Sequence, residues 1–135
     1  MAYDKPLPVP NIESKPYWQG CKAHRLLLQT CDQCGHAQFY PRSLCTQCHS
    51  ESLSWKPSSG HGTVYSFTVV RRAPSQAFKA DLPYVIAIVE VEGGVRMMTN
   101  IVSCAPEQVE VGMPVRVVFD NVSDEISLPK FEPTA

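Results

Sequence analysis

Four cysteines, arranged as two C-x-x-C pairs, are the residues of this chain whose types and spacing indicate the most specific chemistry. They are Cys31, Cys34, Cys45 and Cys48. Each C-x-x-C turn directs two thiolates at a common centre, and four thiolates match the closed tetrahedron that a structural Zn²⁺ ion prefers. The ten residues from Gly35 to Leu44 between the pairs are enough for a hairpin to double back. The pattern therefore predicts a structural zinc site, for which iron is a competing metal.

Other interpretations of these cysteines fit less of the pattern. The run from Cys45 to His49 also matches c-type haem attachment, but haem would leave the first pair unexplained. Haem attachment and disulfides both require an exported or oxidising setting, and residues 1–20 contain no apolar segment typical of a signal peptide. A thioredoxin-like site would need a βαβ pattern, which this region lacks. His36 and His49 are alternative ligands, although both lie beside cysteines that the spacing already places.

Length and charge limit the remaining function classes. The chain has 135 residues, enough for one small domain with a metal-dependent satellite. Its formal net charge is −1, so it lacks the basic surface that a nucleic-acid-binding protein normally carries. No run of apolar residues is long enough for a transmembrane helix. We therefore expect a soluble cytoplasmic protein, and a nucleic-acid-binding ribbon and barrel is the alternative of another class.

The segment before the cysteines predicts an extended arm followed by a helix. Pro6, Pro8 and Pro10 keep the first 13 residues extended. Ser14 is a suitable N-cap, and aromatic and apolar residues then recur at helical spacing from Tyr17 to Leu28. This pattern predicts a short amphipathic helix whose aromatic residues pack in the core or face a partner protein.

After Trp55 the pattern changes to short β-strands. Runs of β-branched and aromatic residues occupy positions 63–71, 84–91, 95–102 and 115–119. A last short strand at 126–131 contains Pro129, which predicts an edge position. Five short antiparallel strands favour a small OB-like barrel, with a small sandwich as the alternative. The expected organisation is an arm and helix at 1–30, a zinc ribbon at 31–58 and a five-stranded barrel at 59–135.

The long connection between the first two barrel strands is a candidate ligand site. In OB barrels the corresponding loop flanks the binding face. It carries cationic and aromatic side chains that can hold phosphate oxygens and stack on a base, namely Arg71, Arg72, Phe78 and Lys79. An ordinary solvated loop with a buried Phe78 explains the same residues equally well. Among the four histidines, none pairs with a carboxylate and a nucleophile in a pattern that indicates a catalytic triad.

The order of these parts is similar to that of a known family. The motifs are C-D-Q-C-G-H, F-Y-P-R-S-L-C-T-Q-C, S-G-H-G-T-V-Y-S-F-T-V-V, P-Y-V-I-A-I-V-E-V, V-G-M-P-V-R-V-V-F and L-P-K-F-E-P. From about Tyr17 to Pro133 the chain resembles the DUF35 family of rubredoxin-like zinc ribbon and OB-fold proteins. The Gly93-Gly94 pair, where the family often has an acidic residue before its hairpin glycine, is a minor departure.

The resemblance implies a non-catalytic accessory subunit that associates with an enzyme of acyl-CoA metabolism. Expected partners are thiolase-like enzymes, including ketothiolases, acyltransferases and aldolases, or alternatively hot-dog-fold enoyl-CoA hydratases. Coenzyme A carries several phosphates on an adenosine, so Arg71, Arg72, Phe78 and Lys79 are the candidate contacts to a CoA ester. The carbon–carbon chemistry would take place on the partner.

Overall fold

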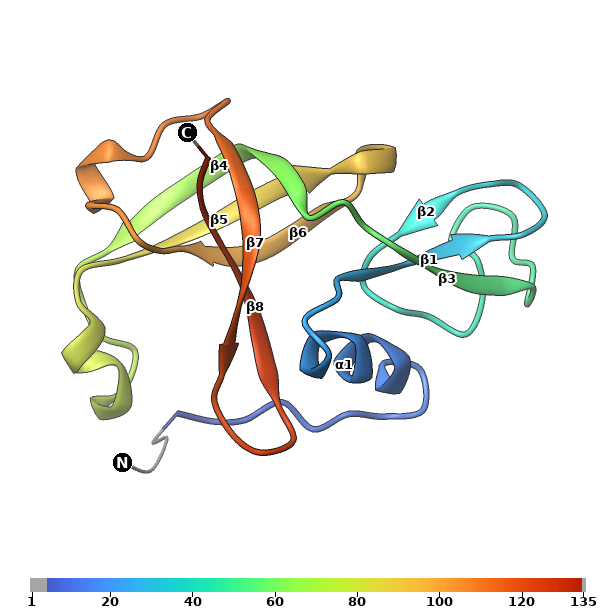
Figure 1. Ribbon diagram of the computed structural model, residues 1–135, viewed down its shortest axis with the longest axis horizontal. Helices are drawn as coiled ribbons and strands as arrows, with labels where there is room; N and C mark the ends of the chain where they lie inside the picture. Colours follow the sequence, from blue (N-terminus) through green and yellow to red (C-terminus); the bar gives the residue numbers. More distant parts are fainter. Residues whose placement is uncertain (1–4, 135) are drawn as a thin grey trace.

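The computed structural model describes residues 5–134, which form a three-stranded ribbon beside a closed five-stranded barrel (Figure 1). In chain order the elements are α1 (Lys15–Lys22), β1 (Leu27–Cys31), β2 (Ala37–Gln38), β3 (Leu53–Pro57), β4 (His61–Val70), η1 (Gln76–Asp81), β5 (Tyr84–Val91), η2 (Glu92–Gly94), β6 (Arg96–Ile101), η3 (Pro106–Gln108), β7 (Pro114–Asn121) and β8 (Ser127–Pro133). The main-β class with an N-terminal helix is confirmed. Among the described residues, no helix is long and apolar enough to cross a membrane.

The N-terminal helix α1 starts where the sequence predicts but is shorter than expected. Its last residue is Lys22, and His24 then adopts a left-handed conformation with φ 59°. The N–H of Arg25 donates to the carbonyl of Gly20 at 2.8 Å, which closes the helix end. The prediction that the helical spacing continues to Leu28 was wrong, because Leu28 lies in β1 with its side chain buried.

The start of α1 also differs in detail from the prediction. The Ser14 hydroxyl makes no capping bond to the first turn of the helix. Instead the N–H of Asn11 donates to the Ser14 Oγ at 3.1 Å, and the N–H of Ser14 donates to the Asn11 Oδ1 at 2.8 Å. These reciprocal bonds fix the point at which the extended arm turns into the helix.

The ribbon is an antiparallel sheet with β1 at its centre. β1 pairs with the short β2 on one side and with β3 on the other, in the order β2-β1-β3. The pairing of Cys31 with Leu53 places the first cysteine at the end of β1, beside the segment that returns from the second cysteine pair. Both C-x-x-C segments therefore meet at one end of the ribbon.

The barrel contains the strands that the sequence predicted, with slightly different ends. Its strand order is β4-β5-β6-β8-β7, and β7 pairs with β4 to close the sheet, which excludes the sandwich alternative. Burial alternates strictly along β5, so one face of this strand fills the interior. A register irregularity between Val64 and Ser66 bends β4. Gly62 is needed there because a Cβ atom would lie 2.7 Å from the carbonyl oxygen of Glu90.

The prediction that the last strand is an edge strand was wrong. β8 lies between β6 and β7 in the closed barrel. It pairs with β7 along its whole length, but its ladder with β6 contains only the Ile101–Phe131 pair. Pro129 is tolerated because the ladder with β6 does not extend to it, and its carbonyl instead accepts a bond from the Thr99 hydroxyl of β6 at 3.1 Å.

The barrel core continues into the N-terminal part of the chain. One cluster of buried side chains includes Val89, Val115 and Phe131 of the barrel together with Tyr17, Cys21 and Leu28. A second connection lies at the junction, where the Ser59 N–H and hydroxyl donate to the Glu92 carboxylate at 3.0 and 2.7 Å. The ribbon is therefore held against the barrel by apolar packing through α1 and by polar contacts at η2.

Candidate functional site

The four cysteine sulfurs come together at the end of the ribbon. All four Sγ atoms lie within 4.8 Å of one another, and they belong to Cys31, Cys34, Cys45 and Cys48. The Cys31–Cys48 and Cys34–Cys45 sulfur pairs are each 3.6 Å apart. Sulfurs bound tetrahedrally to one zinc ion at about 2.3 Å lie about 3.8 Å from one another. The spacing of the sulfurs therefore fits a single tetrahedral metal ion.

The backbone of each C-x-x-C turn prepares its first cysteine to be a thiolate. The N–H groups of Cys34 and Gln33 donate to the Cys31 sulfur at 3.4 Å, and they lower the pKa of this thiol to about 6 because they stabilise the charged form. In the second turn the N–H of Cys48 lowers the pKa of Cys45 in the same way. Thiolates are the form that binds metal, so the two turns favour loading near neutral pH.

Each turn is followed by a residue in the left-handed conformation. Gly35 has φ 78° and His49 has φ 66°, so a non-glycine residue occupies the second of these equivalent positions. Neither His36 nor His49 belongs to the group of candidate ligands. The two other cysteines also lie outside it: Cys21 is fully buried, and Cys104 is half-buried on the barrel. The donor set is thus four sulfurs.

Two buried glutamines support the second cysteine pair. Gln38 donates through Nε2 to the Gln29 Oε1 at 2.6 Å, and its own Oε1 accepts the N–H of Thr46 at 2.9 Å. Gln29 in turn donates to the carbonyl of Arg42 at 2.8 Å and accepts the N–H of Arg42 at 2.9 Å. This network holds the segment that carries Cys45. The sequence analysis missed it, and the only signal was a glutamine in each of two short β-strands.

Comparison with known proteins places the chain in a family. The model of the ChsH2 rubredoxin-like zinc ribbon domain matches residues 18–54, and the model of the ChsH2 C-terminal OB-fold domain matches residues 55–120. A DUF35 domain-containing scaffold protein of Methanothermobacter thermautotrophicus is 40% identical over 96 residues, which cover 70% of this chain and 71% of that protein. The chain belongs to the DUF35 family.

Two other relatives of this DUF35 chain carry functional names. A solved structure described as an Ltp2-ChsH2(DUF35) aldolase matches with a TM-score of 0.86 and 34% identity, over 96% of this chain and 100% of that one. A probable enoyl-CoA hydratase alpha subunit of Thermomonospora curvata is 35% identical over 129 residues. That match covers 96% of this chain but 40% of the hydratase subunit, so the chain spans about two fifths of its length.

The predicted ligand residues of this DUF35 chain lie in the connection that follows β4 and in η1. Arg71, Arg72 and Lys79 have exposed side chains, and the Arg71 guanidinium lies 3.8 Å from the carboxylate of Glu107. Phe78 is half-buried in η1 and lines a cavity of about 770 Å³ at this end of the barrel. The two arginines and Lys79 are not brought together with Phe78 around that cavity.

Replacement of Gln38 tests the support of the metal site. Gln38→Ala removes one of the two donors to the Gln29 Oε1 and leaves the N–H of Thr46 without its acceptor, which costs about 1–3 kcal/mol. We expect faster metal transfer to a chromogenic chelator and a lower thermal midpoint. Gln47→Ala is the matched control, because this glutamine is exposed in the second C-x-x-C turn. Equal transfer rates for the two variants would contradict the assigned role.

Proposed function

We propose that this DUF35 chain is a non-catalytic scaffold subunit of a thiolase-like enzyme that acts on acyl-CoA esters. The observation that carries the proposal is the likeness to the chain of the Ltp2-ChsH2(DUF35) aldolase, which extends over both chains at a TM-score of 0.86. A hot-dog-fold enoyl-CoA hydratase is the second candidate partner, because a hydratase alpha subunit is 35% identical to this chain.

A groove at the seam between ribbon and barrel is the candidate docking face. Its volume is about 390 Å³, and it lies between α1, the turn after β2, and the strands β6 and β8. Tyr40 and Met98 line it and remain 49% and 58% exposed. Large apolar side chains gathered at a groove are typical of protein contacts. Tyr17 is only 4% exposed and packs edge-on against Trp18, so it supports the groove from below rather than facing a partner.

Purification of the tagged chain from its native host tests the proposal. We expect a stoichiometric complex with a protein of thiolase-like sequence that survives size-exclusion chromatography. A complex with a hot-dog-fold protein instead would support the second candidate partner and contradict the first. A lone species of the chain's own mass, 15.0 kDa, at every salt concentration would contradict both.

The same complex tests the docking face. Tyr40→Asp and Met98→Asp each place a charge in the apolar contact, and we expect each to weaken the measured affinity for the partner by about thirtyfold, the effect of losing about 2 kcal/mol. Val111→Asp is the control, because Val111 is 67% exposed and does not line the groove. Wild-type affinity in both groove variants would show that the partner binds elsewhere.

We propose zinc as the metal of the four-cysteine site, since four thiolates and a ribbon of this size are typical of structural zinc. Purified protein is expected to contain about one equivalent of zinc by elemental analysis, or iron with a red colour when iron competes. Cys45→Ser should lose the metal and most of the soluble yield. Cys104→Ser, which changes a half-buried thiol on the barrel, should keep both. Full metal content in Cys45→Ser would contradict the ligand assignment.

The exposed cations at the barrel rim are proposed to contact the phosphates of the partner's CoA ester. Arg71, Arg72 and Lys79 are solvent-accessible, as such a contact requires. Calorimetric titration of the assembled complex with CoA tests this: Arg71→Ala combined with Arg72→Ala should weaken binding by about tenfold. Arg116→Ala removes an exposed arginine of β7 that is paired with Glu132, and should have no effect. Unchanged CoA affinity in the double variant would show that this segment is an ordinary solvated loop.

A further inference from the structure

A cavity of about 770 Å³ lies at the end of the barrel away from the metal site, between the η1 connection and the β7–β8 hairpin. It is of the size that takes a small molecule or a short peptide segment. Its barrel walls are mostly apolar and aromatic, with Phe78, Tyr84, Ile101 and Leu128 among them, and Cys104 also lines it. The remaining wall is formed by residues of the N-terminal arm, Lys5, Pro6, Leu7 and Pro8.

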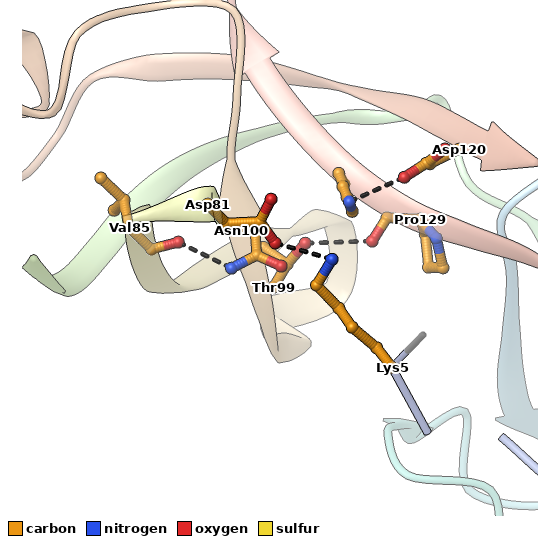
Figure 2. Close-up of polar contacts among 8 residues, drawn as sticks. Lys5, Asp81, Val85, Thr99, Asn100, Asp120 and Pro129 are labelled. Atoms are coloured by element: carbon orange, nitrogen blue, oxygen red, sulfur yellow. Dashed lines mark hydrogen bonds and ion pairs between the residues drawn. The ribbon is translucent and has the colours of Figure 1, made fainter. Parts of the chain in front are cut away.

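The arm is attached to this cavity chiefly through Lys5. The Lys5 Nζ lies 2.7 Å from the Asp81 carboxylate and 5.5 Å from the centre of the Phe78 ring. Figure 2 shows the lysine reaching from the arm to Asp81, which lies at the last position of η1. With only 22% of its side chain exposed, Lys5 is more deeply placed than a typical surface lysine. The cleft therefore recognises a cation through a carboxylate and an aromatic face together.

The barrel side of the cavity is fixed independently of the arm. The Asn100 side chain donates to the carbonyl of Val85 at 2.8 Å (Figure 2). Lys130 pairs with Asp120 at 2.8 Å. These contacts join neighbouring barrel strands and do not involve the arm. The barrel therefore supplies its own side of the cleft, and the arm lies across it as the other wall.

The rest of the arm is built to lie on this site without becoming part of the sheet. Pro6, Pro8 and Pro10 have no N–H to donate to a ladder and hold the chain extended. Between the cleft and α1 the side chains of Val9 and Ile12 are 88% and 94% exposed. In Figure 1 the arm crosses the β7–β8 turn as an extended segment and runs toward η1. The arm is thus anchored at α1 and at Lys5, with little packing between.

We propose that the barrel cleft is a recognition site for an extended segment in which a basic residue precedes alternating prolines, and that the arm occupies it in cis as a removable strap. The occupant is the segment Lys5-Pro6-Leu7-Pro8 of the same chain. The Lys5–Asp81 ion pair sets the balance between the closed and the open cleft. This site is separate from the metal centre, and it shares Asn100, Leu128 and Lys130 with the lining of the seam groove. Testing it requires no partner enzyme.

Alkylation of Cys104 in the metal-loaded full chain reports opening of the strap, because this thiol lines the cavity. Peptide mapping by mass spectrometry separates it from the metal-bound cysteines. Lys5→Glu and Asp81→Lys should each accelerate alkylation by about tenfold, and the combined charge reversal should return the rate to within about twofold of wild type, since the ion pair is re-formed. Lys56→Glu and Glu51→Lys make the same charge changes on the exposed surface of the ribbon and should leave the rate unchanged.

A synthetic peptide of residues 5–13 tests recognition directly. The peptide should bind the Lys5→Glu chain and slow the alkylation of Cys104 again. It should bind the wild-type chain at least about tenfold more weakly, because the arm already occupies the cleft. It should not bind the Asp81→Lys chain. A scrambled peptide is the control. Equal alkylation rates in all variants would contradict the proposal that the arm is a removable strap. Fast alkylation that persists in the combined charge-reversal variant would contradict it as well. Rescued alkylation without binding of the peptide would overturn the recognition site.

Discussion

The arrangement of the four cysteine sulfurs is the constraint on which the ribbon depends. Outside β1 the ribbon buries few apolar side chains, and its strands are short, so it has little else to hold it folded. Backbone N–H groups already favour the thiolate at Cys31 and Cys45, and the Gln29–Gln38 network fixes the segment that leads to the second pair. A bound metal ion then closes the hairpin. The barrel needs no such closure because a closed sheet and a continuous core support it.

The metal site is connected to the proposed docking face through a short stretch of chain. Gln38 holds Thr46 beside Cys45, and the next residues after Gln38 are Phe39 and Tyr40, which line the seam groove. Phe39 also packs against Tyr17 with ring centres 5.3 Å apart, and Tyr17 belongs to the core shared with the barrel. One side of the groove thus depends on the metal-closed ribbon and the other on β6 and β8. This arrangement would make the metal a structural element of the proposed docking face.

Local patterns in the sequence predicted much of this structure. The features that these patterns did not predict depend mainly on contacts between distant parts of the chain. The C-x-x-C spacing brings sulfurs together within single turns, and runs of β-branched residues mark strands whatever their partners. The end of α1 at Lys22 was missed because the left-handed conformation of His24, a non-glycine residue, has no sequence signal. The central place of β8 depends on pairing with β6 and β7, and the Lys5–Asp81 contact joins segments far apart in the chain. Of the four predicted ligand residues, Phe78 lines the cavity at the end of the barrel, and the other three do not line that cavity.

We infer that the metal shapes the proposed docking face, while the barrel stays folded without it. The most direct test is the affinity of the thiolase-like partner for this chain, measured before and after chelation, with hydrogen exchange of the barrel strands β5 and β7 followed in the same samples. We predict that chelation abolishes binding while both strands stay protected. Undiminished binding by the metal-free chain with a protected barrel would contradict the account.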